Sequence, residues 1–196
     1  YIKLLLEAII ILCLADFIAP ASSNKTDYIG AFAVTAGIGL QRWVDEYRKE
    51  NDDYSAIMME TLADRLAEAF AEMLHEKVRK EIWGYASDEK LSVDEMIKEG
   101  YKGIRPAHGY PAAPDHHEKE ILWKLLNASK HTSISLTESY AMMPASSVSG
   151  LYFANQFAQY FQVERISKDQ VSDYANRTGL SIEQIEQLLN ANINYK

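Results

Sequence analysis

The stretch from Gly103 to Pro114, GIRPAHGYPAAP, constrains the fold more than any other part of the chain. It holds three of the five prolines and two of the nine glycines. Proline has no backbone N–H to donate and a fixed φ, so neither a helix nor a central strand can pass through this stretch. Each proline also restricts the residue before it to extended conformations. We therefore predict an ordered, extended loop that loses little entropy when it binds a ligand.

The side chains of this loop suit a small zwitterionic ligand. Arg105 is its fixed charge, and a planar guanidinium matches a carboxylate or a phosphate. Gly109 lets the backbone approach a ligand closely, and Tyr110 offers an aromatic ring with a polar tip. The alternative is a surface crossover loop that its prolines merely stiffen, with Arg105 capping a nearby helix end. These residues alone do not decide between the two.

Composition narrows the class of protein. A chain of 196 residues can form one sizeable core, or one domain with an appended piece. The net charge of -8 and the pI near 5.2 argue against a nucleic-acid-binding surface. The single cysteine, Cys13, excludes an internal disulfide and a zinc site built from cysteines. Such cysteine usage is typical of a reducing compartment, so we expect a cytoplasmic protein.

The first segment, Tyr1 to Ala15, is apolar but too short to span a membrane. A lysine and a glutamate interrupt it, and the remaining apolar run is far below the roughly 20 residues that a membrane helix needs. It also lacks the order of charge, apolar core and cleavage site found in a signal peptide. We predict instead a buried strand that continues toward Phe17 and Ile18, and no membrane association.

Periodicity predicts the elements that follow. Residues 28–35 are rich in aromatic and β-branched residues, as in a buried strand. The next five residues, AGIGL, have only two of the three glycines of a dinucleotide-binding loop, which is too weak a match to assign one. We predict a helix start there instead. A long helix is predicted over residues 54–82. Its predicted apolar stripe consists of Met58, Leu62, Leu66, Ala69 and Met73.

Further helices flank the proline loop. Ser92 and Glu95 have the spacing of a capping box, which predicts a short helix over residues 92–99. Another helix is predicted to begin at Asp115 and to direct four side chains toward the core, namely Ile121, Leu122, Leu125 and Leu126. His116 and His117 could suggest a metal site, but adjacent histidines point in different directions and no third ligand recurs at a useful spacing. We interpret them as polar residues at a helix start and assign no metal site.

In the last third of the chain, the pattern of apolar and polar residues changes from a helical period to a period of two residues. Residues 133–140, 148–153 and 159–166 alternate with period two, and the short links between them predict an antiparallel meander. Two helices close the chain, each with a capping box, at Ser167 and at Ser181, and Gly179 occupies a helix C-terminus. The fold class predicted is α+β, with helices packed around a mainly antiparallel twisted sheet and the proline loop crossing near one sheet edge.

The loop motif, Arg-Pro-x-x-Gly-Tyr-Pro, resembles the signature of the S-adenosylmethionine-binding activation (reactivation) domain of cobalamin-dependent methionine synthase. Other segments match in the same order from Cys13 to the end of the chain. We therefore expect residues 1–196 to form a single activation domain, as part of a larger multidomain enzyme and with its N-terminal portion incomplete. The matching segments are CLADFIAP, DYIGAFAVTAG, LADRLAEAFA, WGYA, LTES and SSVSG.

The resemblance implies a set of S-adenosylmethionine-binding residues. Arg105 is expected to bind the ligand carboxylate, and Glu68 and Glu99 to lie near the sulfonium, whose fixed positive charge nearby carboxylates stabilise. For Glu68 the alternative is a solvated helix face with ordinary ion pairs. The family also has an upstream aspartate for the ligand's amino group, for which this sequence has no match. The remaining implied residues are Ala107, Gly109, Tyr110, Tyr160 and Phe161, and which of the last two faces the ligand stays open.

The resemblance also implies an activity and partners. Oxidised cobalamin would be restored by an electron from a flavodoxin-like donor and a methyl group from S-adenosylmethionine, in support of methyl transfer from methyltetrahydrofolate to homocysteine. Cobalamin would be held by a neighbouring domain of the same polypeptide, and zinc would lie in another domain of the parent enzyme. The sequence shows no set of catalytic side chains, which fits a domain whose reactive centre belongs to a cofactor. A local basic patch around Lys77, Arg79 and Lys80 could receive the donor.

Two alternatives remain open from the sequence. A free-standing methyltransferase would bind the same ligand but would need an acceptor pocket and a general base of its own. A docking or sensing module would bind the ligand without turnover.

Overall fold

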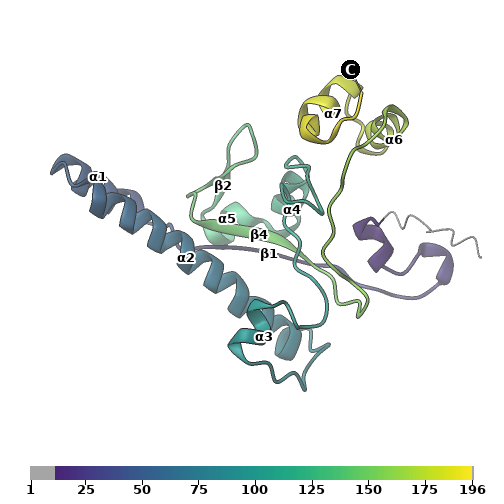
Figure 1. Ribbon diagram of the computed structural model, residues 1–196, viewed down its shortest axis with the longest axis horizontal. Coiled ribbons are helices and arrows are strands. Elements are labelled where there is room, and N and C mark those ends of the chain that lie inside the picture. The colour runs from purple at the N-terminus through teal and green to yellow at the C-terminus, as the bar shows by residue number, and fades with distance from the viewer. Residues whose placement is uncertain (1–11, 196) are drawn as a thin grey trace, which may run out of the picture.

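The computed structural model describes residues 12–195 and has an α+β architecture with two small antiparallel sheets (Figure 1). The fold class is as predicted. Within these residues, no helix is both long and apolar enough to cross a membrane. The helices are α1 (Leu40–Lys49), α2 (Asp53–Lys77), α3 (Val93–Ile97), α4 (Lys119–Leu126), α5 (Ala128–Thr132), α6 (Lys168–Thr178) and α7 (Ile182–Leu188), with single-turn segments η1 (Leu14–Phe17), η2 (Ala21–Ser23), η3 (Val78–Ile82, a π-helical turn) and η4 (Asn190–Asn192). The strands are β1 (Gly30–Thr35), β2 (Ser135–Leu136), β3 (Met142–Met143) and β4 (Ser147–Tyr152).

The central layer is the antiparallel pair of β1 and β4, with Gly30 opposite Tyr152 and Thr35 opposite Ser147. The long helix α2 crosses this pair diagonally and packs on both strands (Figure 1). Phe32 and Val34 of β1 are buried between the sheet and the helix, together with Tyr152 and Ala71. One face of a two-stranded sheet is thereby shielded from water, which an isolated strand pair needs in order to be stable.

The face of α2 that packs on the sheet is not the predicted apolar stripe. Ala63, Ala67, Ala71 and His75 are buried at four-residue spacing. Small alanine side chains let the helix lie close to the strands. The predicted stripe instead lies on the exposed surface of the helix. Its four large side chains are about half exposed, namely Met58, Leu62, Leu66 and Met73, and Ala69 is also exposed.

The predicted three-stranded meander is wrong. Strand β4 pairs with β1, more than a hundred residues earlier, while β2 and β3 form a separate two-stranded sheet. Residues 159–165 have no strand partner, and Ile166 makes an isolated parallel bridge with Ile193. The physical reason is that the proline loop occupies the other edge of β4: Leu151 N donates to Pro106 O over 2.9 Å, and Ile104 and Phe153 exchange both backbone hydrogen bonds.

The N-terminal prediction falls largely on residues 1–11, which lie outside the described residues. At residues 14–17 the structure has the short helix η1 instead of the predicted strand. Phe17 is nevertheless buried, because it packs edge-on against Phe153 and also contacts Phe161 and Ile104.

Helix α4 buries one side only. Leu122 and Trp123 pack with Ala128 and Ile134, whereas Ile121 and Leu125 are largely exposed, contrary to the prediction that all four apolar positions face the core. The helix also begins at Lys119 rather than Asp115. The side chain of Asp115 accepts hydrogen bonds from His117 N and from the hydroxyl of Tyr174 on α6, so it organises the turn before the helix.

The predicted starts of the remaining helices are confirmed. Ser92 caps α3 and Ser181 caps α7, and both make the reciprocal capping box, as Ser167 does at α6. Gly179 ends α6 with φ of 75°. Helices α6 and α7 share a separate core of Val171, Ala175, Ile185 and Leu189, and they form a distinct lobe at the C-terminal end in Figure 1.

Candidate functional site

The proline loop is ordered because it is hydrogen-bonded to β4 along its first half. Gly103 has φ of 78°, and an added Cβ there would overlap the carbonyl oxygen of Phe153. On the β4 side, a Cβ on Gly150 would come within 2.5 Å of the carbonyl oxygen of Pro106. Two glycines therefore permit the loop to lie directly against the strand. The predicted extended loop at a sheet edge is confirmed.

A cavity of about 440 Å³ lies between this loop and α2. Its wall combines the backbone and prolines of the loop with carboxylates from α2 and from the end of α3. All of the site residues predicted from the sequence except Gly109 line it. The full lining is Phe32, Glu68, Glu99, Arg105, Pro106, Ala107, Tyr110, Pro111, Ala112, Val148, Tyr160 and Phe161.

Arg105 is the cation of this cavity and is held at both its main chain and its side chain. Its backbone N donates to the hydroxyl of Tyr160 over 3.0 Å. Its side chain is only 14% exposed, and the guanidinium Nη2 donates to Glu72 Oε2 over 2.5 Å. The Nε of Arg105 is buried and has no partner among the described residues. A buried donor without a partner is unfavourable, whereas the Arg105 residue as a whole lines the cavity.

Glu68 and Glu99 approach the cavity from different elements. Glu68 lies on α2, one turn before Glu72. Glu99 follows α3 in the left-handed backbone conformation, with φ of 57°. Such a conformation is costly for a residue with a Cβ and is often found at functional sites. The helix predicted over residues 92–99 is therefore shorter in the structure, because α3 ends at Ile97 and Glu99 makes the turn that follows.

The two adjacent aromatic residues Tyr160 and Phe161 have different surroundings. Phe161 lines the cavity but packs against Phe17, with 6.2 Å between ring centroids, so it belongs to the core beneath. Tyr160 is partly exposed, and its hydroxyl lies 3.0 Å from Arg105 N and 3.5 Å from the hydroxyl of Tyr101. At the rim of the cavity, Tyr110 is 61% exposed.

A second cavity of about 200 Å³ lies on the other side of Arg105. It shares Arg105 and Glu99 with the first cavity, and its remaining wall comes from Glu72, Tyr101 and three apolar side chains around α3, which are Val93, Met96 and Ile97. Arg105 therefore forms part of the partition between the two spaces.

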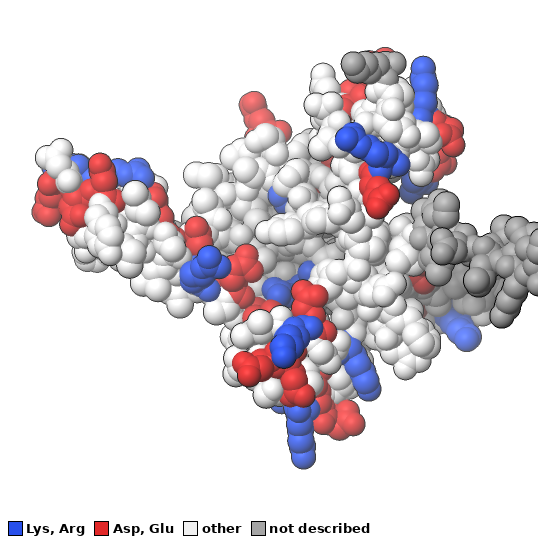
Figure 2. Space-filling model, in the orientation of Figure 1, with Lys and Arg blue, Asp and Glu red and all other residues white. Residues whose placement is uncertain are grey.

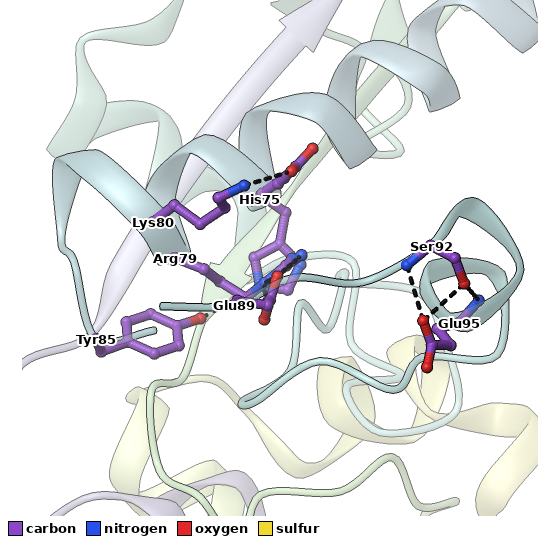
Figure 3. A network of polar contacts seen from close by, with 8 residues as sticks. His75, Arg79, Lys80, Tyr85, Glu89, Ser92 and Glu95 are labelled. Atoms are coloured by element: carbon purple, nitrogen blue, oxygen red, sulfur yellow. Dashed lines mark hydrogen bonds and ion pairs between the residues drawn. The ribbon is translucent and has the colours of Figure 1, made fainter. Parts of the chain in front are cut away.

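A buried polar cluster lies at the C-terminal end of α2, where Figure 3 shows His75, Arg79, Tyr85 and Glu89 close together. Arg79 is fully buried and binds Glu89 through two nitrogens over 2.8 to 3.1 Å, with its guanidinium 4.3 Å from the ring of Tyr101. The ring of His75 stacks on the ring of Tyr152, with 5.1 Å between their centroids, and its centroid lies 4.8 Å from that of Tyr101. Burial, together with the charges of Arg79 and Arg105, lowers the pKa of His75 to about 3, so this imidazole is neutral at pH 7.

This cluster corrects the predicted basic patch. Arg79 is enclosed and neutralised by Glu89, so it contributes no charge to the surface, and Lys80 pairs with Glu76 over 3.2 Å. In Figure 2 the charged side chains gather at the free end of α1 and α2, around α3 and over the C-terminal lobe, with both signs mixed. Sequence reasoning did not identify Glu72 or Tyr101, although the four-residue step from Glu68 to Glu72 was a usable signal.

A second polar cluster lies behind the turn at Gly109. Gly109 has φ of 91°, its N donates to Ala113 O, and the ring of His116 lies directly against its Cα. His116 Nδ1 is 2.8 Å from the Nζ of buried Lys119. Burial lowers the pKa of Lys119 and is the main cause that lowers the pKa of His116. Gly109 is thus a support for the loop rather than part of the cavity wall.

His108 completes this cluster. It is buried with its Nε2 3.5 Å from Glu118, and burial lowers its pKa to about 4. Burial raises the pKa of Glu118, whose carboxylate accepts from the hydroxyl of Tyr174. Over residues 12–195 no group of His, Cys, Asp and Glu side chains is arranged to hold a metal ion. The side chains of this cluster contact one another, and the ring of His116 packs against the loop at Gly109.

Comparison with known proteins agrees with this geometry. Residues 7–179 match the model of the family described as the vitamin B12 dependent methionine synthase, activation domain. A crystal structure of the MetH reactivation domain bound to AdoHcy is similar with a TM-score of 0.92 and 55% sequence identity. The match covers 94% of this chain and 57% of that chain, so this chain spans somewhat more than half the length of the protein it resembles. This chain therefore belongs to the family of activation domains of vitamin B12 dependent methionine synthase.

Proposed function

We propose that this chain binds S-adenosylmethionine and presents its methyl group to cobalamin held by a neighbouring domain. The observation that supports the proposal most directly is the cavity in which one guanidinium, two carboxylates and the proline loop surround a single space. The similar structure of the MetH reactivation domain contains AdoHcy, the demethylated product of the same ligand. We propose further that residues 1–196 act as one activation domain.

The residues present fit this ligand. A volume of about 440 Å³ is in the range of small-molecule sites. The guanidinium of Arg105, which lines the cavity, is suited to the ligand carboxylate, and Glu68 and Glu99 supply negative charge that can stabilise a sulfonium. Ala107, together with Pro106, Pro111 and Ala112 in the loop wall, offers backbone groups and a small apolar surface for the nucleoside.

Within this proposal, the chain contributes placement rather than acid and base chemistry. When bound, S-adenosylmethionine supplies an electrophilic methyl group. Arg105 and Tyr160 orient its amino-acid end, the loop fixes its nucleoside, and Tyr110 at the exposed rim faces the corrin. Holding two reactants in a productive geometry accounts for a large part of the rate of many bimolecular reactions.

We assign the chain to a cobalamin-dependent methionine synthase that acts in methionine biosynthesis in the cytoplasm, with a flavodoxin-like protein as electron donor. Family membership supports the enzyme class. The free, exposed thiol of Cys13 fits a reducing compartment. Zinc and cobalamin would be held in other domains of that enzyme.

Calorimetric titration with S-adenosylmethionine tests the proposal. Replacing Arg105 by alanine removes the charge-assisted hydrogen bonds to the carboxylate, each contributing roughly 1.5 to 3 kcal/mol, so Kd should rise at least tenfold. Arg42→Ala is the matched control, because Arg42 is an exposed arginine of α1 paired with Glu46. Equal affinity of wild type and Arg105→Ala would overturn the assignment.

A further inference from the structure

Glu72 is the residue through which α2 contacts Arg105. It lies one turn beyond Glu68, yet it does not line the large cavity; its carboxylate faces the smaller one. Its Oε2 accepts from Arg105 Nη2, and its Oε1 is buried without a partner among the described residues. A ligand in the large cavity would therefore contact Arg105 and leave Glu72 behind it.

The arginine side chain is long and can adopt many rotamers, so an unrestrained guanidinium loses much conformational freedom when it binds a carboxylate. Tyr160 fixes only the backbone of Arg105. The ion pair with Glu72 engages Nη2 and leaves the Nε of Arg105 without a partner. Because a guanidinium is planar, fixing one nitrogen restricts the direction of the others.

The structure assigns to Glu72 the role of a positioning residue, which orients the guanidinium of Arg105 for the carboxylate of the ligand. This inference rests on the proposed function, because it concerns the same ligand. Two effects of the Glu72 charge oppose each other: it orders Arg105, and it also neutralises part of the positive charge that attracts the carboxylate. Because Glu72 already holds the guanidinium of Arg105, and Arg105 lines the cavity that the ligand would enter, we expect the ordering effect to be the larger one.

Two ligands separate the role of Glu72 from a general effect on the fold. S-adenosylhomocysteine carries the amino-acid end, whereas 5′-methylthioadenosine has the nucleoside and the sulfur but no carboxylate. In the full-length protein, Glu72→Ala should raise the Kd for S-adenosylhomocysteine about tenfold, which is the effect of losing one charge-assisted contact. The Kd for 5′-methylthioadenosine should change less than twofold. Glu72→Gln, which keeps an acceptor of the same size, should recover part of the affinity and remains usable should the alanine variant not fold.

Matched controls complete the test. Glu76→Ala removes a carboxylate one turn further along α2, of similar exposure and paired with Lys80, and should leave both affinities unchanged. In an Arg105→Ala background, Glu72→Ala should add less than a twofold effect, because Glu72 acts through Arg105. Unchanged or tighter binding of S-adenosylhomocysteine by Glu72→Ala, or equal weakening of both ligands, overturns the inference alone. Failure of the wild type to bind S-adenosylhomocysteine overturns the proposed function as well.

Discussion

The contact between Gly109 and His116 gives the sharpest test of how the proline loop is held. Replacing Gly109 by alanine adds a Cβ that would lie 2.5 Å from His116 Nε2 and 2.6 Å from Nδ1, with Cε1 closer still. The ring cannot turn away freely, because Lys119 Nζ holds its Nδ1 and also donates to Tyr140 O over 3.0 Å. The same substitution places a residue with a Cβ at φ of 91°.

The cost of this substitution has two parts. A residue with a Cβ in the left-handed region costs roughly 1 to 2 kcal/mol. Overpacking against the imidazole adds about 1 to 3 kcal/mol. The free protein can relieve both by shifting the loop, so that the ligand must restore the loop on binding. We therefore expect Gly109→Ala to raise the Kd for S-adenosylhomocysteine by about 30-fold to 100-fold, equivalent to roughly 2 to 3 kcal/mol.

The double variant Gly109→Ala, His116→Ala separates these parts. Removing the imidazole relieves the overlap but not the backbone strain, so calorimetry should show recovery of about tenfold in Kd relative to Gly109→Ala. Gly39→Ala is the control, because Gly39 has φ of 79° but no atom within 4 Å of the added Cβ. It should lower stability and leave Kd unchanged. Wild-type affinity in Gly109→Ala, or no recovery in the double variant, would refute the reasoning.

Two further predictions concern the buried cluster of His75, Arg79 and Glu89. Glu89→Gln should lower the free energy of unfolding by about 3 to 5 kcal/mol, because it leaves the buried guanidinium of Arg79 without its counter-charge; urea denaturation measures this, and a loss below about 1 kcal/mol would contradict it. The pKa of His75 is about 3 in the folded protein and 6.5 in a model peptide, so the unfolded chain binds more protons below pH 6.5. The contribution of neutral His75 to the free energy of unfolding should therefore be fully present above pH 6.5. It should fall by up to about 1.4 kcal/mol per pH unit as the pH drops toward 3. His75→Gln should make this dependence shallower between pH 7 and pH 5, and an unchanged slope would exclude His75 as its source.

The sequence was informative where local chemistry decides the structure. The prolines at 106, 111 and 114 exclude regular structure whatever surrounds them, and the serines at 92, 167 and 181 cap helices through contacts three residues away. For the same reason the loop could be predicted, with Arg105, Gly109 and Tyr110 as candidate site residues, whereas the other candidates were implied by the family resemblance. The ligand roles of these residues remain predictions.

Long-range pairing could not be predicted in this way. The alternation in β4 indicates a strand but not its partner, and β1 lies more than a hundred residues away. In α2, both the alanine stripe and the stripe of larger residues have helical period. Periodicity does not show which of them meets the sheet, because close packing of small side chains can outweigh a larger apolar area elsewhere. The pairing of Glu72 with Arg105 could likewise not be predicted, since the two residues are 33 positions apart in the sequence.

The edge of β4 that the loop covers has a consequence for solubility. The carbonyl oxygen of Pro106 accepts from Leu151 N of β4, and Ile104 exchanges both backbone hydrogen bonds with Phe153, the residue just after β4. Such an edge, if uncovered, offers free backbone groups to the strands of other molecules. A substitution that detaches the loop would thus promote intermolecular pairing as well as weaken the ligand site, and in this protein aggregation would accompany the loss of affinity.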